Sequence, residues 1–483
     1  MSIVSLFELL VNGLFEAEEK FFDNPKDFYS LEKAVKESTE AFAAGFLGEI
    51  LSSVNHQICC CSWREGRYNI QRTDTRTLIS SVGDVSFDCT YFQRLTGEGG
   101  YTYLLEELIG LDRHERFTEE AEVMLLTEAL KTSYSGAAGI LPSKQKITKT
   151  TVMNKVHRLA EEMPCEAPEE VKKADYLFIE ADEDHIAEQH GDKSVDNKSF
   201  ISKLIYVYEG KQKVAGYSDR KELVGSFYFS GLYPGREGNK TLWRNVRDYI
   251  DRNYDTEYLK RIFVSGDGAA WIKGGVDYLD KALFCADKYH LMKHINQAAT
   301  QMPDEKEAVK EELWHLLYAK NPKAKERFDE YTGNIMQTAK NPDKVETLRT
   351  YVLENWAAIR RTLRNKLVEG CSAESHVSHV LSDRLSSRPM GWSQTGADRM
   401  SKLRCYEKNY GREGIIKLVR YSREQRRFPA TGTDGAVAEA VTLREIRAEH
   451  YNQAKSYIER IQAHIPGMTG KKTASIRTQL RLL

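Results

Sequence analysis

At residues 262–268 the chain reads IFVSGDG, a short apolar run that ends in Asp267 between two glycines. The apolar positions predict a buried strand, and the glycines let the backbone turn sharply into the helical pattern at 269–279. Ligands of α/β proteins gather at the carboxyl ends of such strands. The same aspartate can also serve as the N-cap of the next helix. Taken alone, the pattern favours neither interpretation.

Strand-like and helix-like patterns alternate on both sides of this run. Strands are expected at 176–186, 200–208, 223–229, 261–266 and 282–286, with helices at 242–254, at 269–279 and from 291 onward. Three consecutive strands followed by helix, strand, helix, strand and helix indicate a mixed α/β sheet. From about 296 to 367 the pattern is helical throughout and highly charged. We therefore expect an α/β core interrupted by a helical segment.

Acidic residues gather on one face of the first of these strands. The period-two alternation of a strand places Glu180, Asp182 and Asp184 on the face opposite the apolar residues. Carboxylates among apolar residues cost desolvation free energy unless they bind a cation, accept hydrogen bonds or reach solvent. The strand is therefore either the exposed edge of an antiparallel sheet or part of a cation site.

A further acid, Glu374, lies in the sequence CSAESHVSHVL at 371–381. Ser372 can cap a helix here, and on that helix Glu374 shares a face with Val377 and Leu381. The face that packs on the sheet would then carry Glu374 as well. The alternative is a glutamate stabilised by the helix macrodipole. Two carboxylates on neighbouring strands and one on a packed helix can together hold two divalent ions for phosphodiester chemistry.

Four stretches resemble bacterial insertion-sequence transposases of the ISLre type. They are IEADEDHI at 179–186, VSGDGAAWIKGG at 264–275, CADKYHLMKHI at 285–295 and CSAESHVSHVLSDRLSSRPMGWS at 371–393. The order Asp, Asp, helical segment, Glu is similar to that of DDE transposases with a ribonuclease-H-like fold. Mutator-like and hAT relatives carry an all-helical insertion before the Glu, and the long separation of Asp267 from Glu374 agrees with such an insertion.

The resemblance implies a DNA transposase that hydrolyses element ends and then attacks target DNA with the freed 3'-hydroxyl. The implied catalytic and metal-binding residues are Asp182, Asp267 and Glu374. Asp184 is the alternate first ligand, because it lies two residues further along the same strand face. The implied cofactor is Mg²⁺, with Mn²⁺ as substitute. The implied partners are double-stranded DNA, as transposon ends and target DNA, and further copies of the chain in a homo-oligomer on DNA.

The residues by themselves support only metal-assisted phosphodiester chemistry on DNA. A nuclease without strand transfer is one alternative. The other is a DNA-binding regulatory or domesticated protein with an inactive site. These alternatives differ from a transposase in what the protein does to DNA that carries the element's ends.

The stretch from 132 to 160 contains no Asp or Glu and predicts a DNA-binding helix-turn-helix. It has a short helix, a Pro-Ser break and a second helix opened by Thr148 or Lys149, although an ordinary pair of solvated helices has the same pattern. With Val152 and Val156 as the inner stripe, the residues expected to face DNA are Lys149, Asn154, Lys155 and Arg158.

Two other places carry candidate DNA contacts. A basic zone that begins with Arg384 and Arg388 follows Glu374 and suits phosphate binding. In Asp287-Lys288-Tyr289-His290, the resemblance implies a role for His290 near the active site or the transposon end. A helix-start histidine hydrogen-bonded to the aspartate explains the same residues equally well.

Composition limits the class of protein. The chain has 483 residues, a formal net charge of -1 and 41% hydrophobic residues, as ordinary globular proteins do. No apolar run is long enough to cross a membrane, and the N-terminus lacks a basic leader. The eight cysteines include no CxxC pair and predict reduced thiols. We expect a cytoplasmic protein without a membrane partner.

Alternation at 77–93 around a Gly83-Asp84 turn predicts a β-hairpin. The expected organisation of the whole chain has seven parts. An N-terminal helical region (1–75) precedes the β-hairpin and helix-turn-helix (76–160), and a linker (161–175) leads to the catalytic core (176–295). The all-helical insertion (296–367), the Glu-bearing helix (368–395) and a basic C-terminal region (396–483) follow.

Overall fold

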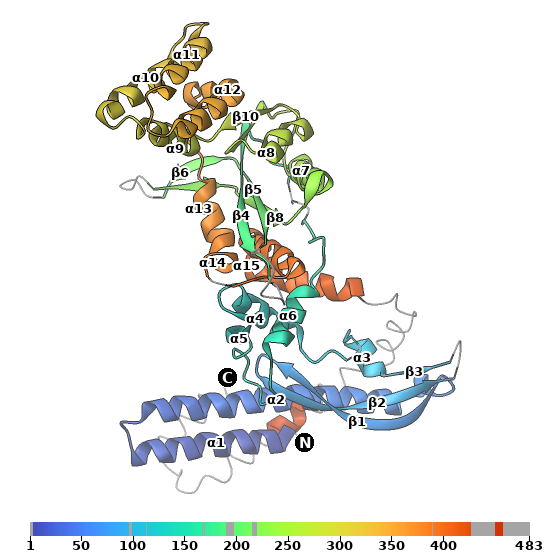
Figure 1. Cartoon of the computed structure of the whole chain (residues 1–483). Helices are drawn as coiled ribbons and strands as arrows, with labels where there is room; N and C mark the ends of the chain where they lie inside the picture. Colours follow the sequence, from blue (N-terminus) through green and yellow to red (C-terminus); the bar gives the residue numbers. More distant parts are fainter. Residues whose placement is uncertain are drawn as a thin grey trace. The chain divides into compact units, whose positions relative to one another are not determined.

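The computed structural model describes residues 3–426 and 450–456, apart from 96–98, 113, 167, 169, 190–197, 215–219 and 389. The chain divides into two compact units. The first comprises Met1–Ala129, Ser133–Val152 and Val419–Leu483, and the second Leu130–Thr132 and Met153–Leu418. Figure 1 labels most of their helices and strands. Much of the predicted C-terminal region (396–483) lies outside the described residues. Among the helices that are described, none is long and apolar enough to cross a membrane.

The first unit joins a helical hairpin to a β-hairpin. Helices α1 (Ile3–Asp23) and α2 (Phe28–Cys60) pack against each other, and the Asp27 carboxylate caps α2 by accepting a hydrogen bond from Ser30 N at 3.1 Å. Strands β1 (Tyr68–Ser80) and β2 (Gly83–Arg94) pair antiparallel, with β3 (Tyr101–Thr102) beside β2.

The structure confirms the predicted β-hairpin and moves its turn. Ser80 pairs with Gly83, so the turn is Ser81-Val82 and not Gly83-Asp84. Gly83 has a φ of +119° and already belongs to β2. Short helices complete this part of the chain: α3 (Leu104–Leu108), α4 (Glu119–Ala129), α5 (Tyr134–Ala137) and α6 (Lys149–His157).

The second unit is built on a five-stranded mixed sheet in the order β10-β9-β4-β5-β8. Its strands are β4 (Tyr176–Ala187), β5 (Ser199–Tyr208), β8 (Phe227–Gly231), β9 (Arg261–Gly266) and β10 (Ala282–Ala286). The first three pair antiparallel, whereas β9 and β10 run parallel to β4. The predicted mixed α/β sheet is confirmed, with β4 at its centre.

The predicted strand at 223–229 is wrong in one respect, because two strands occupy it. Strand β7 (Lys221–Val224) forms a separate hairpin with β6 (Gly210–Lys213), and β8 begins only at Phe227. Gly225 between them has a φ of +62°, which a continuous strand does not tolerate. A single glycine therefore divides what reads as one apolar run.

Helix α7 (Gly235–Asn253) covers the apolar face of the central strands. Leu177 and Ile179 of β4 share a buried core with Trp243 and Val246 of α7. The predicted helix after Asp267 is shorter than expected, because α8 (Ala270–Lys273) passes into a 3₁₀ turn at Gly274–Tyr278. This layer holds the carboxyl end of β9 in place.

The packing of this layer gives a test of the fold at Gly275. A Cβ at Gly275 would overlap the ring of Trp243, which is fully buried and donates a hydrogen bond to Trp271 O at 2.8 Å. We expect Gly275→Ala to lower the free energy of unfolding by about 1–3 kcal/mol, as overpacking does. In α11 of the same unit, Gly333 has open space around it, so Gly333→Ala should raise stability by roughly 0.5–1 kcal/mol. Thermal unfolding of both variants tests the pair, and equal melting temperatures would contradict it.

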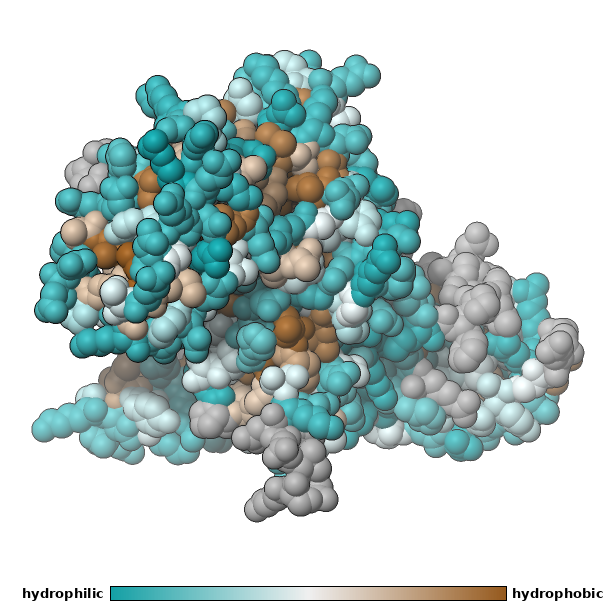
Figure 2. Space-filling model, turned by 45° about the horizontal axis from the view of Figure 1, so that its top comes forward, coloured by the Kyte–Doolittle hydropathy of each residue, from teal (hydrophilic) through white to brown (hydrophobic). Residues whose placement is uncertain are grey.

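The helical segment predicted at 296–367 is confirmed. Helix α9 (Lys288–Ala299) leads into α10 (Lys306–Tyr318), α11 (Ala324–Met336) and α12 (Pro342–Arg364), and the four helices share a buried apolar core. The chain continues in α13 (Ala373–Val377), α14 (Asp383–Leu385) and the long α15 (Gln394–Arg426), which is interrupted at Gly411. Most of the visible face in Figure 2 is hydrophilic, with apolar residues in small groups.

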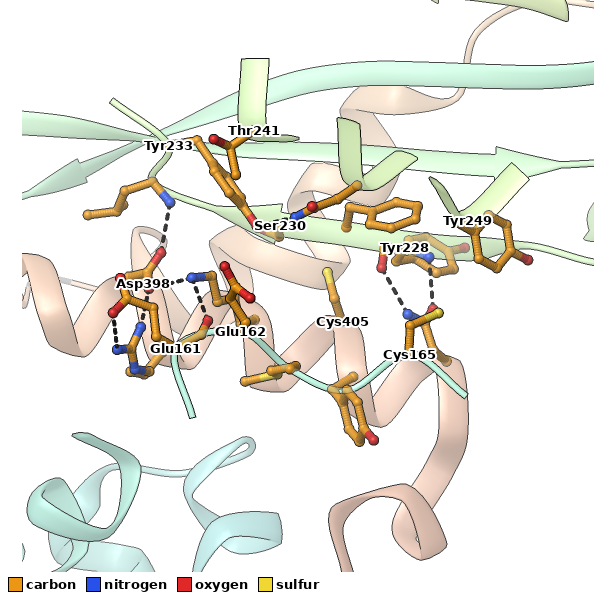
Figure 3. Close-up of a pocket in the computed structure, with 18 of the residues that line it drawn as sticks. Glu161, Glu162, Cys165, Tyr228, Ser230, Tyr233, Thr241, Tyr249, Asp398 and Cys405 are labelled. Atoms are coloured by element: carbon orange, nitrogen blue, oxygen red, sulfur yellow. Dashed lines mark hydrogen bonds and ion pairs between the residues drawn. The ribbon is translucent and has the colours of Figure 1, made fainter. Parts of the chain in front are cut away.

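A pocket of about 800 Å³ lies beside the edge strand β8 (Figure 3). Its walls come from β8, α7, α15 and residues 161–165 of the predicted linker. The Asn409 side chain accepts from Tyr228 N and donates to Tyr228 O, both at 2.8 Å, and so covers part of the strand's open edge. None of the candidate acids Asp182, Asp267 or Glu374 lines this pocket.

Candidate active site

Three aspartates lie at one edge of the sheet, on or directly after the adjacent parallel strands β4, β9 and β10. Gly266 and Ala286 are the last residues of β9 and β10 and pair with each other, and Asp267 and Asp287 follow them directly. The register between β4 and β9, continued two residues past its last pair, sets Asp182 level with Asp267. The topology therefore brings these acids to one edge of the sheet, as the sequence predicted for the first two.

The two glycines around Asp267 are required by close approaches of the backbone. A Cβ on Gly266 would lie 2.9 Å from Ala181 O on β4, and Gly268 has a φ of +102°. A Cβ on Gly268 would also meet the Asn355 side chain of α12 at 3.4 Å. The sharp turn predicted from the two glycines is confirmed. Helix α12 of the helical segment thus reaches the carboxyl end of β9.

Hydrogen bonds orient each of the three aspartates. Asp267 Oδ1 accepts from Ala269 N at 2.8 Å, and Asp182 Oδ1 accepts from Glu183 N at 2.9 Å. Ala269, not Asp267, is the N-cap of α8. Asp287 is the N-cap of α9 and is buried, and its carboxylate also binds His290 Nδ1 at 2.7 Å. The helix-start interpretation of His290 is therefore correct as a description of its hydrogen bond.

The charges of these residues act on one another. Burial raises the pKa of Asp182 to about 6, the negative charges of Asp267 and Glu374 add to the rise, and His290 opposes it. The hydrogen bond that His290 donates to Asp287 raises the pKa of His290, and the charges of Asp182 and Asp267 raise it further. Asp267, His290 and Glu374 therefore lie near enough to Asp182 for their charges to act on its pKa.

Glu374 is placed differently from the prediction. Val377 and Leu381 are buried, as expected of the inner stripe, but Glu374 itself is exposed at the start of α13. A π-helical turn at Ser378–Ser382 follows α13 and breaks the regular helical spacing. Such turns occur frequently at functional sites. No feature of the sequence indicated this one.

The residues can be tested against a divalent cation by their chemistry. Asp182 and Asp267 are half-buried carboxylates, and carboxylate oxygens are preferred ligands of Mg²⁺ and Mn²⁺. Among the residues that the structure describes, however, no three His, Cys, Asp or Glu side chains are gathered closely enough to hold an ion together. The donor set fits the metal, while the expected gathering of all three acids around one ion is not seen.

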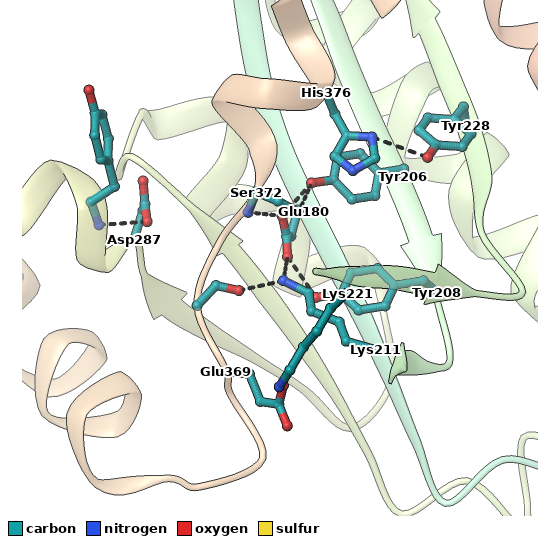
Figure 4. A network of polar contacts seen from close by, with 12 residues as sticks. Glu180, Tyr206, Tyr208, Lys211, Lys221, Tyr228, Asp287, Glu369, Ser372 and His376 are labelled. Carbon is teal, nitrogen blue, oxygen red and sulfur yellow. Dashed lines mark hydrogen bonds and ion pairs between the residues drawn. The ribbon is translucent and has the colours of Figure 1, made fainter. Parts of the chain in front are cut away.

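The other two acids of the β4 face have different partners. The Asp184 carboxylate accepts the single hydroxyl hydrogen of Ser386, whose Oγ lies 2.9 and 2.8 Å from the two carboxylate oxygens, and burial raises the pKa of Asp184. Glu180 is buried and bound by Tyr206, Tyr208, Lys211 and Ser372 (Figure 4). Burial alone would raise the pKa of Glu180, but these donors hold it below the ordinary value. Because β4 is the central strand, the exposed-edge interpretation of its acids is wrong.

The helix at 149–157 begins as predicted, with Val152 and Val156 fully buried. Lys149, Asn154 and Arg158 are exposed, but the outward orientation predicted for Lys155 is wrong, because this side chain is only 4% exposed. Lys155 follows Val152 by three positions and therefore lies on the same helix face. DNA binding by this segment stays a prediction.

The basic zone after Glu374 contains a second correction. Arg388 is exposed, whereas Arg384 is 5% exposed and its guanidinium carbon lies 4.7 Å from the ring centroid of Trp392. Arg384 also donates to Met390 Sδ at 3.5 Å. Arg384 is therefore packed on Trp392 and is not an exposed cation.

The raised pKa of Asp182 predicts how the stability of the metal-free protein depends on pH. An unfolded aspartate titrates near pH ~4, so the folded state holds the Asp182 proton more tightly and gains stability from it at low pH. That contribution should be lost as pH rises from about 4 to about 6. With a chelator present, the melting temperature should fall less steeply with rising pH over this range in Asp182→Asn than in the unmodified protein. An identical slope in both proteins would contradict the assignment.

Residues 22–422 match the family described as "Uncharacterised protein family (UPF0236)". The chain belongs to this family. A UPF0236 protein of Caldanaerobacter subterraneus subsp. tengcongensis that carries eleven locus names is 31% identical over 396 residues, which cover 81% of this chain and 80% of that protein. Another from the same organism, with four locus names, is 30% identical over 380 residues, 78% of this chain and 77% of its own.

A solved structure, the Drosophila P element transposase strand transfer complex, is 12% identical to this UPF0236 chain. The similarity covers 65% of this chain and 82% of that one, with a TM-score of 0.22.

Proposed function

We propose that this UPF0236 protein is a DDE-type DNA transposase of an ISLre-type insertion sequence, with a ribonuclease-H-like catalytic core. The observation that carries the proposal is the level placement of Asp182 and Asp267 on adjacent parallel strands, within the electrostatic influence of Glu374. Three antiparallel strands followed by two parallel ones, with the first strand central, support the assignment of the core. The helices between Asp267 and Glu374 agree with an all-helical insertion.

The distribution of the relatives also supports this proposal. One UPF0236 protein is encoded at eleven loci of one genome and another at four. Repeated copies of one coding sequence in a genome are typical of a mobile element that multiplies there. A housekeeping enzyme has no such reason to occur many times.

In this proposal Asp182, Asp267 and Glu374 would hold Mg²⁺, or Mn²⁺ as its substitute, with Asp182 preferred over Asp184 because Ser386 already binds the latter. When bound, the metal lowers the pKa of the attacking water or 3'-hydroxyl and stabilises the leaving oxygen. Asp287 holds His290 through Nδ1 and favours its protonated form, which can donate from Nε2 to a phosphate oxygen.

The proposed DNA contacts come from exposed cations. Lys149, Arg158 and Arg388 are exposed and would bind phosphates, and exposed Asn154 would contact base edges or backbone. Because transposition joins two element ends to a target, we also propose that the chain works as a homo-oligomer assembled on DNA. Binding through phosphates should weaken as salt rises, because counterions are released.

The test is a strand-transfer assay with the purified full chain. Labelled DNA that carries the element's own ends is incubated with target DNA, with and without Mg²⁺. Metal-dependent nicking at the ends followed by joined products supports the transposase. Nicking without joining favours the nuclease, and end binding without nicking in either Mg²⁺ or Mn²⁺ favours the regulatory or inactive protein.

A further inference from the structure

Glu180 is a buried carboxylate on the central strand that the proposed chemistry leaves without a task. It is 1% exposed and lies two residues before Asp182 on β4. A buried carboxylate is expensive unless donors surround it. Such donors are present here, and the elements that supply them show what the carboxylate holds together.

The hydrogen bonds to Glu180 come from three separate parts of the chain (Figure 4). Tyr206 and Tyr208 of the neighbouring strand β5 donate their hydroxyls, the latter at 2.6 Å. Lys211 of the β6 strand donates at 3.0 Å to the same oxygen as Tyr208. Ser372, just before α13, donates from its backbone N at 2.5 Å and from Oγ at 3.0 Å.

The hairpin of β6 and β7 also contacts residues 369 and 370, which come just before Ser372. Lys211 Nζ also donates to Gly370 O at 2.8 Å, and Lys221 of β7 forms an ion pair with Glu369. Gly370 has a φ of +111°, a backbone conformation that favours glycine. Residues 369–372 are therefore fastened both to the sheet and to the hairpin.

Helix α13 has a second attachment one turn further on. The ring of His376 lies 4.4 Å from that of Tyr206, and His376 Nδ1 lies 3.1 Å from the hydroxyl of Tyr228. Glu374 lies between the two attachments, at Ser372 and at His376. Its backbone therefore has little freedom to shift along the sheet.

We propose that Glu180 is a positioning residue that sets the place of Glu374 relative to Asp182 and Asp267. The bond from Ser372 to Glu180 lies two residues before Glu374 on one side and two residues before Asp182 on the other. One hydrogen-bonded contact thus joins the segments that carry the first and third acids. The inference rests on the proposed function, in which these acids share the metal site.

The test compares Glu180→Gln with a matched buried glutamate in the full chain. Glutamine keeps the shape of Glu180, but it loses the charge and turns an amide donor toward the existing donors. The control is Glu122→Gln in the first unit, where Glu122 is also buried and accepts from Arg423 at 2.6 Å. Both variants remove one buried, hydrogen-bonded charge, but only the first touches the loop before α13.

The first measurement is hydrogen exchange of a peptide covering 366–377, which needs no activity. Replacing the carboxylate that accepts from Ser372 N by a weaker, uncharged amide should speed exchange there by about tenfold or more in Glu180→Gln, while Glu122→Gln leaves this peptide unchanged. Unchanged exchange in Glu180→Gln would overturn the anchor. If Glu180→Gln does not fold, Lys211→Met is measured instead, because it removes the donor that binds both Glu180 and Gly370 O.

The second measurement is cleavage of end-containing DNA as a function of Mg²⁺. We expect Glu180→Gln to cleave about tenfold or more slowly, with a higher half-saturating Mg²⁺ and unchanged end binding. Faster exchange with normal cleavage and normal Mg²⁺ dependence would overturn the positioning role alone. Absence of cleavage by the unmodified protein would overturn the proposed function, and the positioning role with it, even where the exchange result identifies the anchor.

Discussion

Asp267→Asn is expected to abolish cleavage and joining of end-containing DNA while leaving the binding of that DNA nearly unchanged. Asparagine keeps the shape of the side chain but lacks the anionic oxygen that a divalent ion requires. Loss of such a ligand removes several kcal/mol of transition-state stabilisation, roughly a thousandfold or more in rate. Single-turnover cleavage in Mg²⁺, with electrophoretic shifts on the same DNA, separates catalysis from binding.

Asp184→Asn is the matched control for this substitution. Asp184 is an acid of the same sheet, on β4, but Ser386 binds it, so its loss should cost far less activity than the loss of Asp267. The metal-free Asp267→Asn protein should melt at the same temperature or higher, because a negative charge next to Asp182 has been removed. Full strand transfer by a folded Asp267→Asn protein would refute the metal-ligand role.

Short-range patterns sufficed to predict the sheet and two of its acids. The run at 262–268 contains both the strand and the two glycines that the close approach to β4 and the positive φ of Gly268 require. Alternation along 176–186 placed Asp182 on the right face. Both properties follow from the period of a strand and from the allowed backbone conformations, which depend on few neighbouring residues.

Partners distant in sequence could not be predicted in this way. Glu180 and Asp182 share a strand face, and the sequence does not distinguish them. Glu180, however, accepts hydrogen bonds from Tyr206, Lys211 and Ser372, which are 26 to 192 residues away. The β6 and β7 hairpin that supplies Lys211 was not predicted, because the sequence around Gly225 has the pattern of one continuous strand. The division of roles among the acids therefore had to come from the structure.

The two wrong DNA-contact residues have a shared cause. Lys155 was expected on the outward face of a helix whose inner stripe is Val152 and Val156, and Arg384 was expected in a basic zone that binds phosphates, but both side chains are buried. Long cationic side chains can pack their apolar stems and place the charge against a partner, as Arg384 does on Trp392. A basic residue is therefore not always exposed, and Lys155, three positions after Val152, lies on the inner face of its helix.

The largest expected effect on stability is in the first unit, at Arg423. Its side chain is 3% exposed, donates to Glu122 Oε2 at 2.6 and 3.1 Å, and donates to Phe117 O at 3.0 Å. Arg423→Met should lower the free energy of unfolding by about 3–5 kcal/mol, because it leaves the buried Glu122 carboxylate without its partner charge. Urea unfolding, with hydrogen exchange of peptides from α4, measures the loss.

Arg420 provides the comparison within the same helix. It pairs with Glu119 at 2.8 Å, but the two side chains are 61% and 37% exposed, so Arg420→Met should change stability by no more than about 1 kcal/mol. The double variant Glu122→Leu with Arg423→Met should recover much of the loss, since it removes both buried charges and leaves apolar groups in their place. Equal losses for Arg420→Met and Arg423→Met would show that burial does not set the strength of these pairs, and would contradict the structure at this point.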